Sequence, residues 1–182
     1  MKRLALSLVA ALSMAAVATT AFAADTVTQA LTAGTRTASN ANLALANVAY
    51  AHTAQTSTGS MTLTADDSTG SGAGWNVTIL SSAFVYTGAN SGTNIPAVNF
   101  SLSSAAAPVM TAGQAVDVTG GPKVPAVSPV GTLDTARKTV QANVGFGLGT
   151  YTQALGVSLS IPAQSRAGTY TGTLTTTNSA AP

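Results

Sequence analysis

Apolar and polar residues alternate with a period of two along much of this chain, and no apolar stripe of helical period interrupts the pattern. The clearest runs are residues 61–63, 75–79, 98–102, 157–161 and 170–174, where Thr, Ser, Asn or Gly separates the larger side chains. A strand with one face in a core and one in solvent shows this alternation. Each run therefore predicts a β-strand.

Segments rich in Gly, Pro, Asn and Ser separate these runs, as at 67–74, 88–93 and 120–131. Short strands with turn signals between them are typical of an all-β sandwich or a Greek-key, barrel-like domain. Four prolines between 105 and 132 predict a long surface connection or edge region there. The stretch 39–50 is compatible with a helix or a strand, and its alternating leucines favour a strand.

The first 23 residues have the features of a secretory signal peptide. Lys2 and Arg3 precede an apolar run, and Ala21 and Ala23 occupy the two positions that a signal peptidase recognises. The run is short for a retained membrane anchor. We therefore expect cleavage after Ala23, a secreted and surface-associated mature chain without a membrane span, a flexible N-terminal segment at 24–39 and a β-sandwich domain at 40–182.

Charge and cysteine content narrow the possible functions. The leader holds two of the seven basic residues, so the remaining five balance the five aspartates, and the chain has no Glu and no Cys. A neutral, sparsely charged domain lacks the basic patch that nucleic-acid binding requires. Without cysteine it has no disulfide or thiolate metal site, so its core alone must hold it. Weak charge repulsion also favours self-association or attachment to a matrix.

The only tryptophan, Trp75, follows a glycine-rich run and begins the predicted strand at 75–79. Glycines at 70, 72 and 74 suit a turn with positive φ angles. The indole supplies the largest apolar surface in a chain with few aromatic residues, which favours a core anchor; the alternative is a stacking platform for a sugar ring.

Two blocks of sequence resemble the WxL domain of bacterial surface proteins. "DSTGSGAGWNV" at 67–77 resembles the family's first motif, with Val77 in place of leucine, and "LSIPAQSRAGTYTGTLTTTNSAAP" at 159–182 resembles its closing motif. The resemblance extends from about residue 40 to the end. The chain departs from the family where a second tryptophan would follow Leu174, because Thr175, Thr176 and Thr177 stand there.

This resemblance implies a secreted β-rich domain that attaches non-covalently to the cell wall through peptidoglycan and often belongs to a larger surface assembly. It would bind glycan through aromatic faces and through amide and hydroxyl groups. Trp75, Tyr151 and Tyr170 are the residues we expect to contact such a ligand. If both family tryptophans belong to one binding surface, half of that surface is absent here.

No catalytic constellation appears in the sequence, so we expect a non-enzymatic protein that needs no cofactor. His52 is the only histidine, no nucleophile elbow accompanies it, and it is expected in an exposed strand or loop. Asp66 and Asp67 are a weak candidate calcium site, but an Asp before a Ser-Thr-Gly turn more often accepts backbone hydrogen bonds there.

Two functions of different classes follow. The first is a non-catalytic module that binds the cell envelope, with wall glycan or other surface proteins as partners. The second is a self-assembling structural subunit of an extracellular fibre or surface layer, in which residues 24–39 donate a strand to the uncovered edge of another copy.

Overall fold

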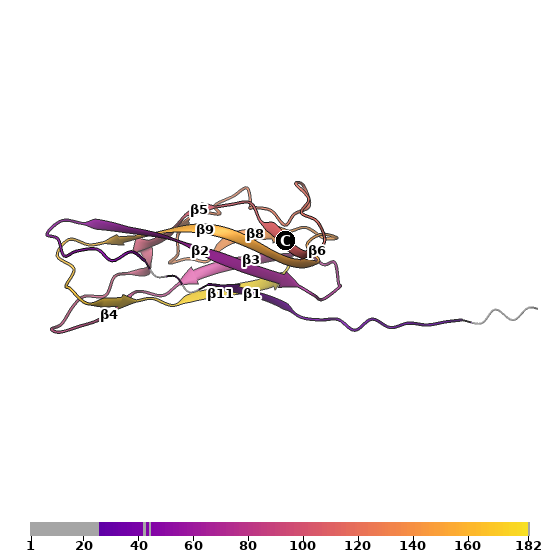
Figure 1. Cartoon of the computed structure of the whole chain (residues 1–182), viewed down its shortest axis with the longest axis horizontal. Helices are drawn as coiled ribbons and strands as arrows, with labels where there is room; N and C mark the ends of the chain where they lie inside the picture. The colour runs from indigo at the N-terminus through magenta and orange to yellow at the C-terminus, as the bar shows by residue number, and fades with distance from the viewer. Residues whose placement is uncertain (1–25, 42, 44, 182) are drawn as a thin grey trace, which may run out of the picture. The chain divides into compact units, whose positions relative to one another are not determined.

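Antiparallel β-strands form nearly all of the regular structure in the computed structural model, which describes residues 26–41, 43 and 45–181. The chain divides into two units, Met1–Leu31 and Thr32–Pro182, and every assigned strand belongs to the second (Figure 1). The described residues contain no α-helix and one short 3-10 helix, η1 (Ala97–Asn99). The all-β prediction is confirmed, and the predicted signal peptide, 1–23, lies outside the described residues.

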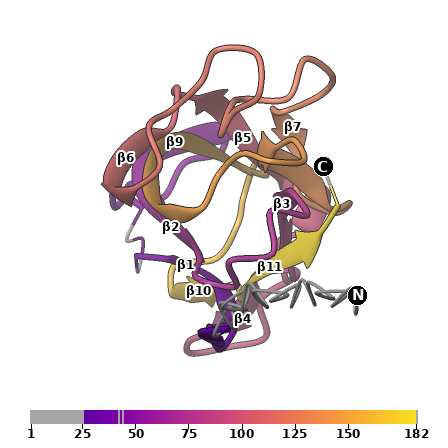
Figure 2. The same cartoon turned by 90° about the vertical axis from the view of Figure 1, so that its right-hand side faces the viewer.

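The strands are β1 (Arg36–Asn40), β2 (Gln55–Asp67), β3 (Trp75–Ser81), β4 (Val85–Thr87), β5 (Phe100–Ala105), β6 (Val109–Gly113), β7 (Gly131–Thr132), β8 (Arg137–Ala142), β9 (Gly149–Ile161), β10 (Thr169–Thr171) and β11 (Leu174–Ala180). The largest sheet has the order β1-β2-β9-β5-β7, with β6 also paired to β9. A second sheet has the order β11-β3-β8, and β4 pairs with β10. Viewed along the strands, β2 and β9 lie across the core from β3 and β11 (Figure 2).

The pairing of β2 with β9 is the longest in the fold. It runs without a register shift from Gln55 opposite Ile161 to Asp67 opposite Gly149. Along both strands burial alternates from residue to residue, and most of the inward side chains are buried, including Leu63 on β2 and Leu155 on β9. The two-residue period of the sequence thus corresponds to a real inward face.

Trp75 is a core anchor. Its side chain is 0% exposed, and its indole Nε1–H donates a 2.8 Å hydrogen bond to the backbone oxygen of Gly147. The Tyr151 ring packs beside it, with the ring centroids 6.1 Å apart. A buried indole N–H without an acceptor would offset part of the free energy gained by burying the ring, and the 145–149 turn supplies the acceptor.

The glycines before Trp75 adopt the backbone that the sequence indicated. Gly70, Gly72 and Gly74 all have positive φ angles, between 63° and 73°. At Gly74 a Cβ atom would lie 2.7 Å from the backbone oxygen of Ala142, so the turn also requires close approach of two backbones.

Side-chain amides join the two larger sheets where β1 meets β11. Asn178 Nδ2 donates to the backbone oxygen of Thr37 at 3.0 Å, and Asn40 Nδ2 donates to Thr176 Oγ1 at 2.6 Å. These bonds connect two strand edges that do not pair with each other. The sequence assigned 24–39 to a flexible segment, but residues 36–39 belong to β1, so the folded part begins earlier than predicted.

Three sequence predictions need correction in detail. In 39–50 only the first two residues are in a strand, and the other described residues are irregular. The run 98–102 begins as η1 and becomes β5 at Phe100. The run 170–174 is divided between β10 and β11, which belong to different sheets. Short alternating runs do not reveal where one strand leaves its sheet.

The segment 105–132 is mostly exposed and contains only β6, β7 and isolated bridges, as expected for an edge region. No helix in the described part of the chain is long and apolar enough to cross a membrane.

Replacing Gly147 by alanine is expected to lower the free energy of unfolding by about 3 kcal/mol. The residue has a φ of +80°, and a Cβ atom there would lie 2.6 Å from Trp75 Nε1 and 2.5 Å from Ala142 Cβ. Urea unfolding followed by the fluorescence of the single tryptophan measures the loss.

Gly145→Ala is the matched control. Gly145 has a φ of +84°, but a Cβ atom there would meet nothing within 4 Å. The Gly145→Ala substitution should therefore cost only the free energy of placing alanine at a positive φ angle, about 1 kcal/mol. Equal losses in the two variants would contradict the tight packing of the 145–149 turn against Trp75.

Candidate functional site

A cavity of about 640 Å³ opens at one end of the folded unit. Its walls come from the 41–51 connection after β1, the first residues of β2, the end of β9 and the 162–172 segment that contains β10. Its base is core, because Phe84, Ile95 and Leu159 are buried there. A concave surface with an apolar base and a polar rim is the usual form of a ligand site.

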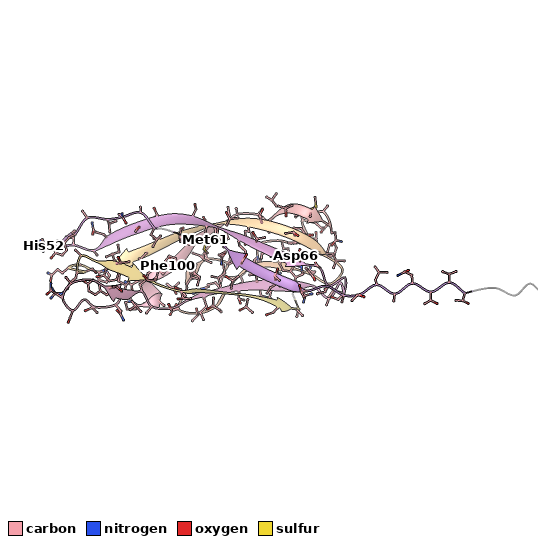
Figure 3. All side chains as sticks on the ribbon, turned by 60° about the horizontal axis from the view of Figure 1, so that its bottom comes forward. His52, Met61, Asp66 and Phe100 are labelled. Atoms are coloured by element: carbon pink, nitrogen blue, oxygen red, sulfur yellow. The ribbon has the colours of Figure 1, made fainter. Side chains whose placement is uncertain are left out.

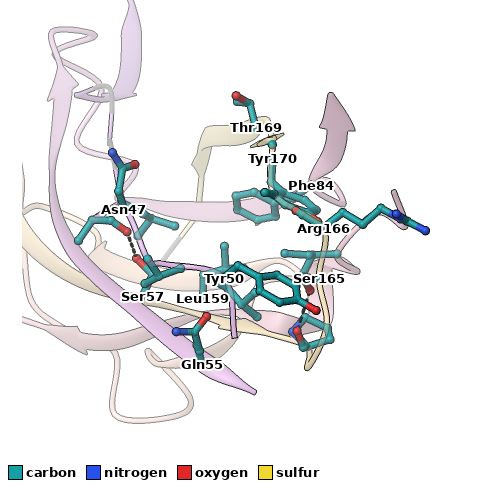
Figure 4. Close-up of a pocket in the computed structure, with 18 of the residues that line it drawn as sticks. Asn47, Tyr50, Gln55, Ser57, Phe84, Leu159, Ser165, Arg166, Thr169 and Tyr170 are labelled. Atoms are coloured by element: carbon teal, nitrogen blue, oxygen red, sulfur yellow. Dashed lines mark hydrogen bonds between the residues drawn. The ribbon is translucent and has the colours of Figure 1, made fainter. Parts of the chain in front are cut away.

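Aromatic rings from separate segments border this cavity. Tyr50 comes from the 41–54 connection, Tyr170 from β10, and Phe84 from the residue before β4 (Figure 4). Tyr170 is held in place because its hydroxyl donates to the Arg166 backbone oxygen at 2.9 Å and its ring packs 5.2 Å from Tyr86. Tyr50 is half-exposed and its hydroxyl lies 3.4 Å from His52 Nδ1.

Uncharged polar groups complete the lining. Ser57 donates to the Ala46 backbone oxygen at 2.8 Å and Ser165 donates to that of Pro162 at 2.7 Å, so both hydroxyl hydrogens are engaged. The side-chain amides of Asn47 and Gln55 make no hydrogen bond to the described residues. Each amide therefore offers a ligand both a donor and an acceptor.

Arg166 is the only charged residue among those that line the cavity. It is exposed, and within the described residues no carboxylate lies within 4 Å of its guanidinium nitrogens. The site therefore combines a neutral surface with one available cation, which can donate two parallel hydrogen bonds to an acidic group.

A smaller cavity of about 440 Å³ adjoins the first. The two share Leu43, Leu45, Phe84 and Gly172 in their walls, and the smaller one continues toward Asn40 and Thr176 at the contact between β1 and β11. Together they form one groove, called the end groove below.

Of the residues that the sequence proposed for ligand contact, only Tyr170 lines the end groove. Trp75 is 0% exposed and Tyr151 is 1% exposed, so neither ring presents a face to a polymer in this structure. The Tyr151 hydroxyl donates to the Gln114 backbone oxygen at 2.7 Å. The structure thus places two of the three rings in the core.

Tyr50, Phe84 and Arg166 are groove residues that the sequence did not identify. They come from segments more than 30 residues apart and share no motif spacing. The nearest signal in the sequence was the aromatic residue that ends the stretch 39–50, for which a strand was expected.

The two aspartates proposed as a weak calcium site are engaged with other groups. Asp67 pairs with Arg36 at 3.0 Å and accepts hydrogen bonds from the backbone N–H and hydroxyl of Thr69, so it caps the 67–72 turn. Asp66 accepts from the hydroxyls of Ser68 and Thr150. Among the described residues no three His, Cys, Asp or Glu side chains converge as metal ligands would.

The pKa values of Asp67 and of Tyr151 both depart from their ordinary values. Burial acts to raise the pKa of Asp67, but hydrogen bonds from Thr69 and Arg36 and the Arg36 charge outweigh it and hold the pKa below its ordinary value of 3.8. Burial, and then the Asp67 charge, raise the pKa of the Tyr151 phenol above its ordinary value of 10.0.

His52 lies in an exposed turn at the opposite end of the folded unit from Asp66 (Figure 3). Its ring contacts that of Tyr50 edge to face, with the centroids 5.2 Å apart. Within the described residues no carboxylate approaches the imidazole within ion-pair distance. Its nearest polar partner is the Tyr50 hydroxyl, so the contact supports the groove wall rather than a catalytic dyad.

The chain matches no known protein-family model, no curated protein and no solved structure.

Replacing Asp67 by asparagine is expected to lower the free energy of unfolding by about 3 kcal/mol at neutral pH, because it leaves the largely buried Arg36 guanidinium without its counter-charge. A carboxyl whose pKa falls on folding stabilises the folded state above its unfolded pKa and loses that contribution as the pH falls through its folded pKa. The stability of the unchanged protein should therefore fall below pH 3.8, and less so in the variant.

Urea unfolding at several pH values measures both effects. Some acid sensitivity persists in the variant, because hydrogen bonds from the backbone N–H groups of Gly120 and Thr119 also lower the pKa of Asp117. Asp134→Asn is the control, since that exposed carboxylate accepts no hydrogen bond within the described residues. Equal losses in the Asp67 and Asp134 variants would contradict the proposed pair.

Proposed function

We propose that this chain is a secreted, non-catalytic module that binds a polysaccharide of the cell envelope in the end groove. The observation that carries the proposal is the lining of the groove, where Tyr50 and Tyr170 stand at opposite walls above an apolar base. Sugar rings have apolar C–H faces that pack on aromatic rings, and their hydroxyls pair with amides such as those of Asn47 and Gln55.

The charge of the groove favours an acidic glycan over a neutral one. Arg166 has no carboxylate partner in the described part of the chain, and no acidic residue lines the groove to repel an anion. Peptidoglycan carries free carboxylates on its peptide stems, and a carboxylate is well suited to a guanidinium. The resemblance to the WxL family supports the same ligand, because wall attachment is what that family suggests.

The proposal assigns the family's binding role to different residues from those that the resemblance indicated. Trp75 maintains the core that supports the groove, and ligand contact belongs to Tyr50, Tyr170 and Arg166. This arrangement requires no second tryptophan, so the departure at 175–177 does not remove the site.

Tyr50→Ala is expected to weaken binding to isolated peptidoglycan about tenfold, because it removes an exposed wall of the groove. Co-sedimentation of the mature chain with sacculi over a range of protein concentrations measures the dissociation constant. Stability should change little, since the Tyr50 ring is half-exposed. Val127→Ala, an exposed apolar residue outside the groove, is the matched control.

A Tyr50 variant that remains folded and binds sacculi as tightly as the Val127 variant would contradict the assignment of the groove. If the unchanged chain shows no saturable binding, the proposed ligand itself is wrong.

Arg166→Gln is expected to weaken binding several-fold at low salt and less at high salt, because counter-ions screen an exposed ion pair. Lys138→Gln removes the same charge from β8, outside the groove, and should leave the dissociation constant unchanged. Equal effects of both substitutions would show that overall charge, and not the groove, governs binding.

A further inference from the structure

β6 presents an open strand edge. It pairs with β9 on one side, and no other described strand pairs with it. All five of its residues are exposed, which is true of no other described strand. Val109 is 62% and Met110 is 42% exposed, and no charged residue or proline lies within the strand. Natural proteins usually protect such an edge, since it can pair with another chain.

The other outer edges of the two larger sheets are partly covered. β7 pairs with the outer side of β5, and Lys123 bridges to Gln141 on the outer side of β8. The amides of Asn40 and Asn178 connect the edges of β1 and β11. Figure 2 shows β6 outside β9 at the periphery. A bulge between Met110 and Ala112 is the one irregularity in the β6 edge.

Residues 26–32 form a second unpaired feature of the chain. The sequence TVTQALT alternates Val27, Gln29 and Leu31 with threonines and one alanine, which is a strand pattern. Yet no strand includes these residues, and the side chains of Val27 and Leu31 are 95% and 91% exposed. Like β6, the segment carries no charge, so no repulsion opposes its pairing with that edge.

The segment is too short to pair along β6 of its own chain. Gly34 and Thr35 bond to Ser68 just after β2, at the end of the sheet where Asp67, Gly149 and Gly113 are in register. The distance from β1, across β2, β9 and β6, to a strand added beyond β6 is four strand spacings, about 19 Å. About six extended residues are needed to span it. Crossing the sheet would therefore use most of residues 26–32 and leave too few of them to pair with β6 of the same chain.

We propose that residues 26–32 of one copy add as a strand to the outer edge of β6 of a second copy. Val27 or Leu31 then packs beside Met110, and the backbone groups of both segments become paired. Donor and acceptor are different surfaces of one chain, so the contact is head-to-tail and can repeat. The chain thereby polymerises into a filament without any other component.

The test uses mature chains that begin at Ala24 and measures mass by light scattering after size-exclusion chromatography. The unchanged chain should form a series of oligomers whose mean mass rises with concentration. Val27→Asp/Leu31→Asp disables the donor, and Val109→Lys/Met110→Lys disables the acceptor. Each variant alone should be a monomer with unchanged tryptophan fluorescence, since all four side chains are exposed.

An equimolar mixture of the two variants should give dimers and nothing larger, because only one functional donor meets one functional acceptor. Val85→Lys is the control: it places a lysine on an exposed valine of β4, at the other end of the folded unit from β6 (Figure 1), and should still polymerise. A monomeric unchanged chain, polymerisation of either double variant alone, or a mixture that stays monomeric would each overturn the proposal.

The outcome is independent of the proposed glycan site, because none of the substituted residues lines the end groove. Donor and acceptor variants should still co-sediment with sacculi, and Tyr50→Ala should still polymerise. Loss of one property with retention of the other identifies which proposal has failed.

Discussion

The thirteen-residue pairing of β2 with β9 is the constraint on which the rest of the structure depends. These strands supply much of one inward face, and β1, β5 and β6 extend their sheet from the free edges. The chain has no cysteine, so no covalent link fixes this arrangement. Burial of apolar surface and the backbone ladder must offset the whole conformational entropy of ordering. A long pairing without a register shift meets that demand, because a slip of one residue would turn every buried side chain outward.

The scarcity of charge shapes the polar contacts. Among the described residues the only salt bridge is the one between Arg36 and Asp67, and it joins β1 to β2 at one end of the sheet. The junction between β1 and β11 relies on the neutral amides of Asn40 and Asn178. A neutral amide is less costly to bury than a charge, and it can hold a strand edge that the backbone leaves unpaired. Salt should therefore change the stability of the fold little, and it should weaken the proposed contact between Arg166 and an acidic ligand more.

The sequence predicted the features that depend on a local alternation of apolar and polar residues. It did not predict the features that form where segments distant in the sequence meet. Alternation identified the strands that contain Met61, Trp75 and Val157, and the glycines before Trp75 indicated their positive φ angles. It missed β1, since "RTASN" has no large apolar residue and its place is set by partners in β2 and β11. The end groove was hidden for a similar reason, because Tyr50, Phe84 and Arg166 meet only after the sheets have formed.

The aromatic residues connect stability with the two proposed functions. With few rings and no disulfide, the fold uses Trp75, Tyr151 and Phe100 to fill its interior. That leaves Tyr50 and Tyr170 at the end groove, while the opposite end presents β6 and exposed aliphatic side chains (Figure 1). A surface with little charge gives weak repulsion between copies, so the uncovered strand edge decides which contact forms. Because the groove and the edge share no residue, strand addition through β6 would leave the groove of each copy open to a polymer.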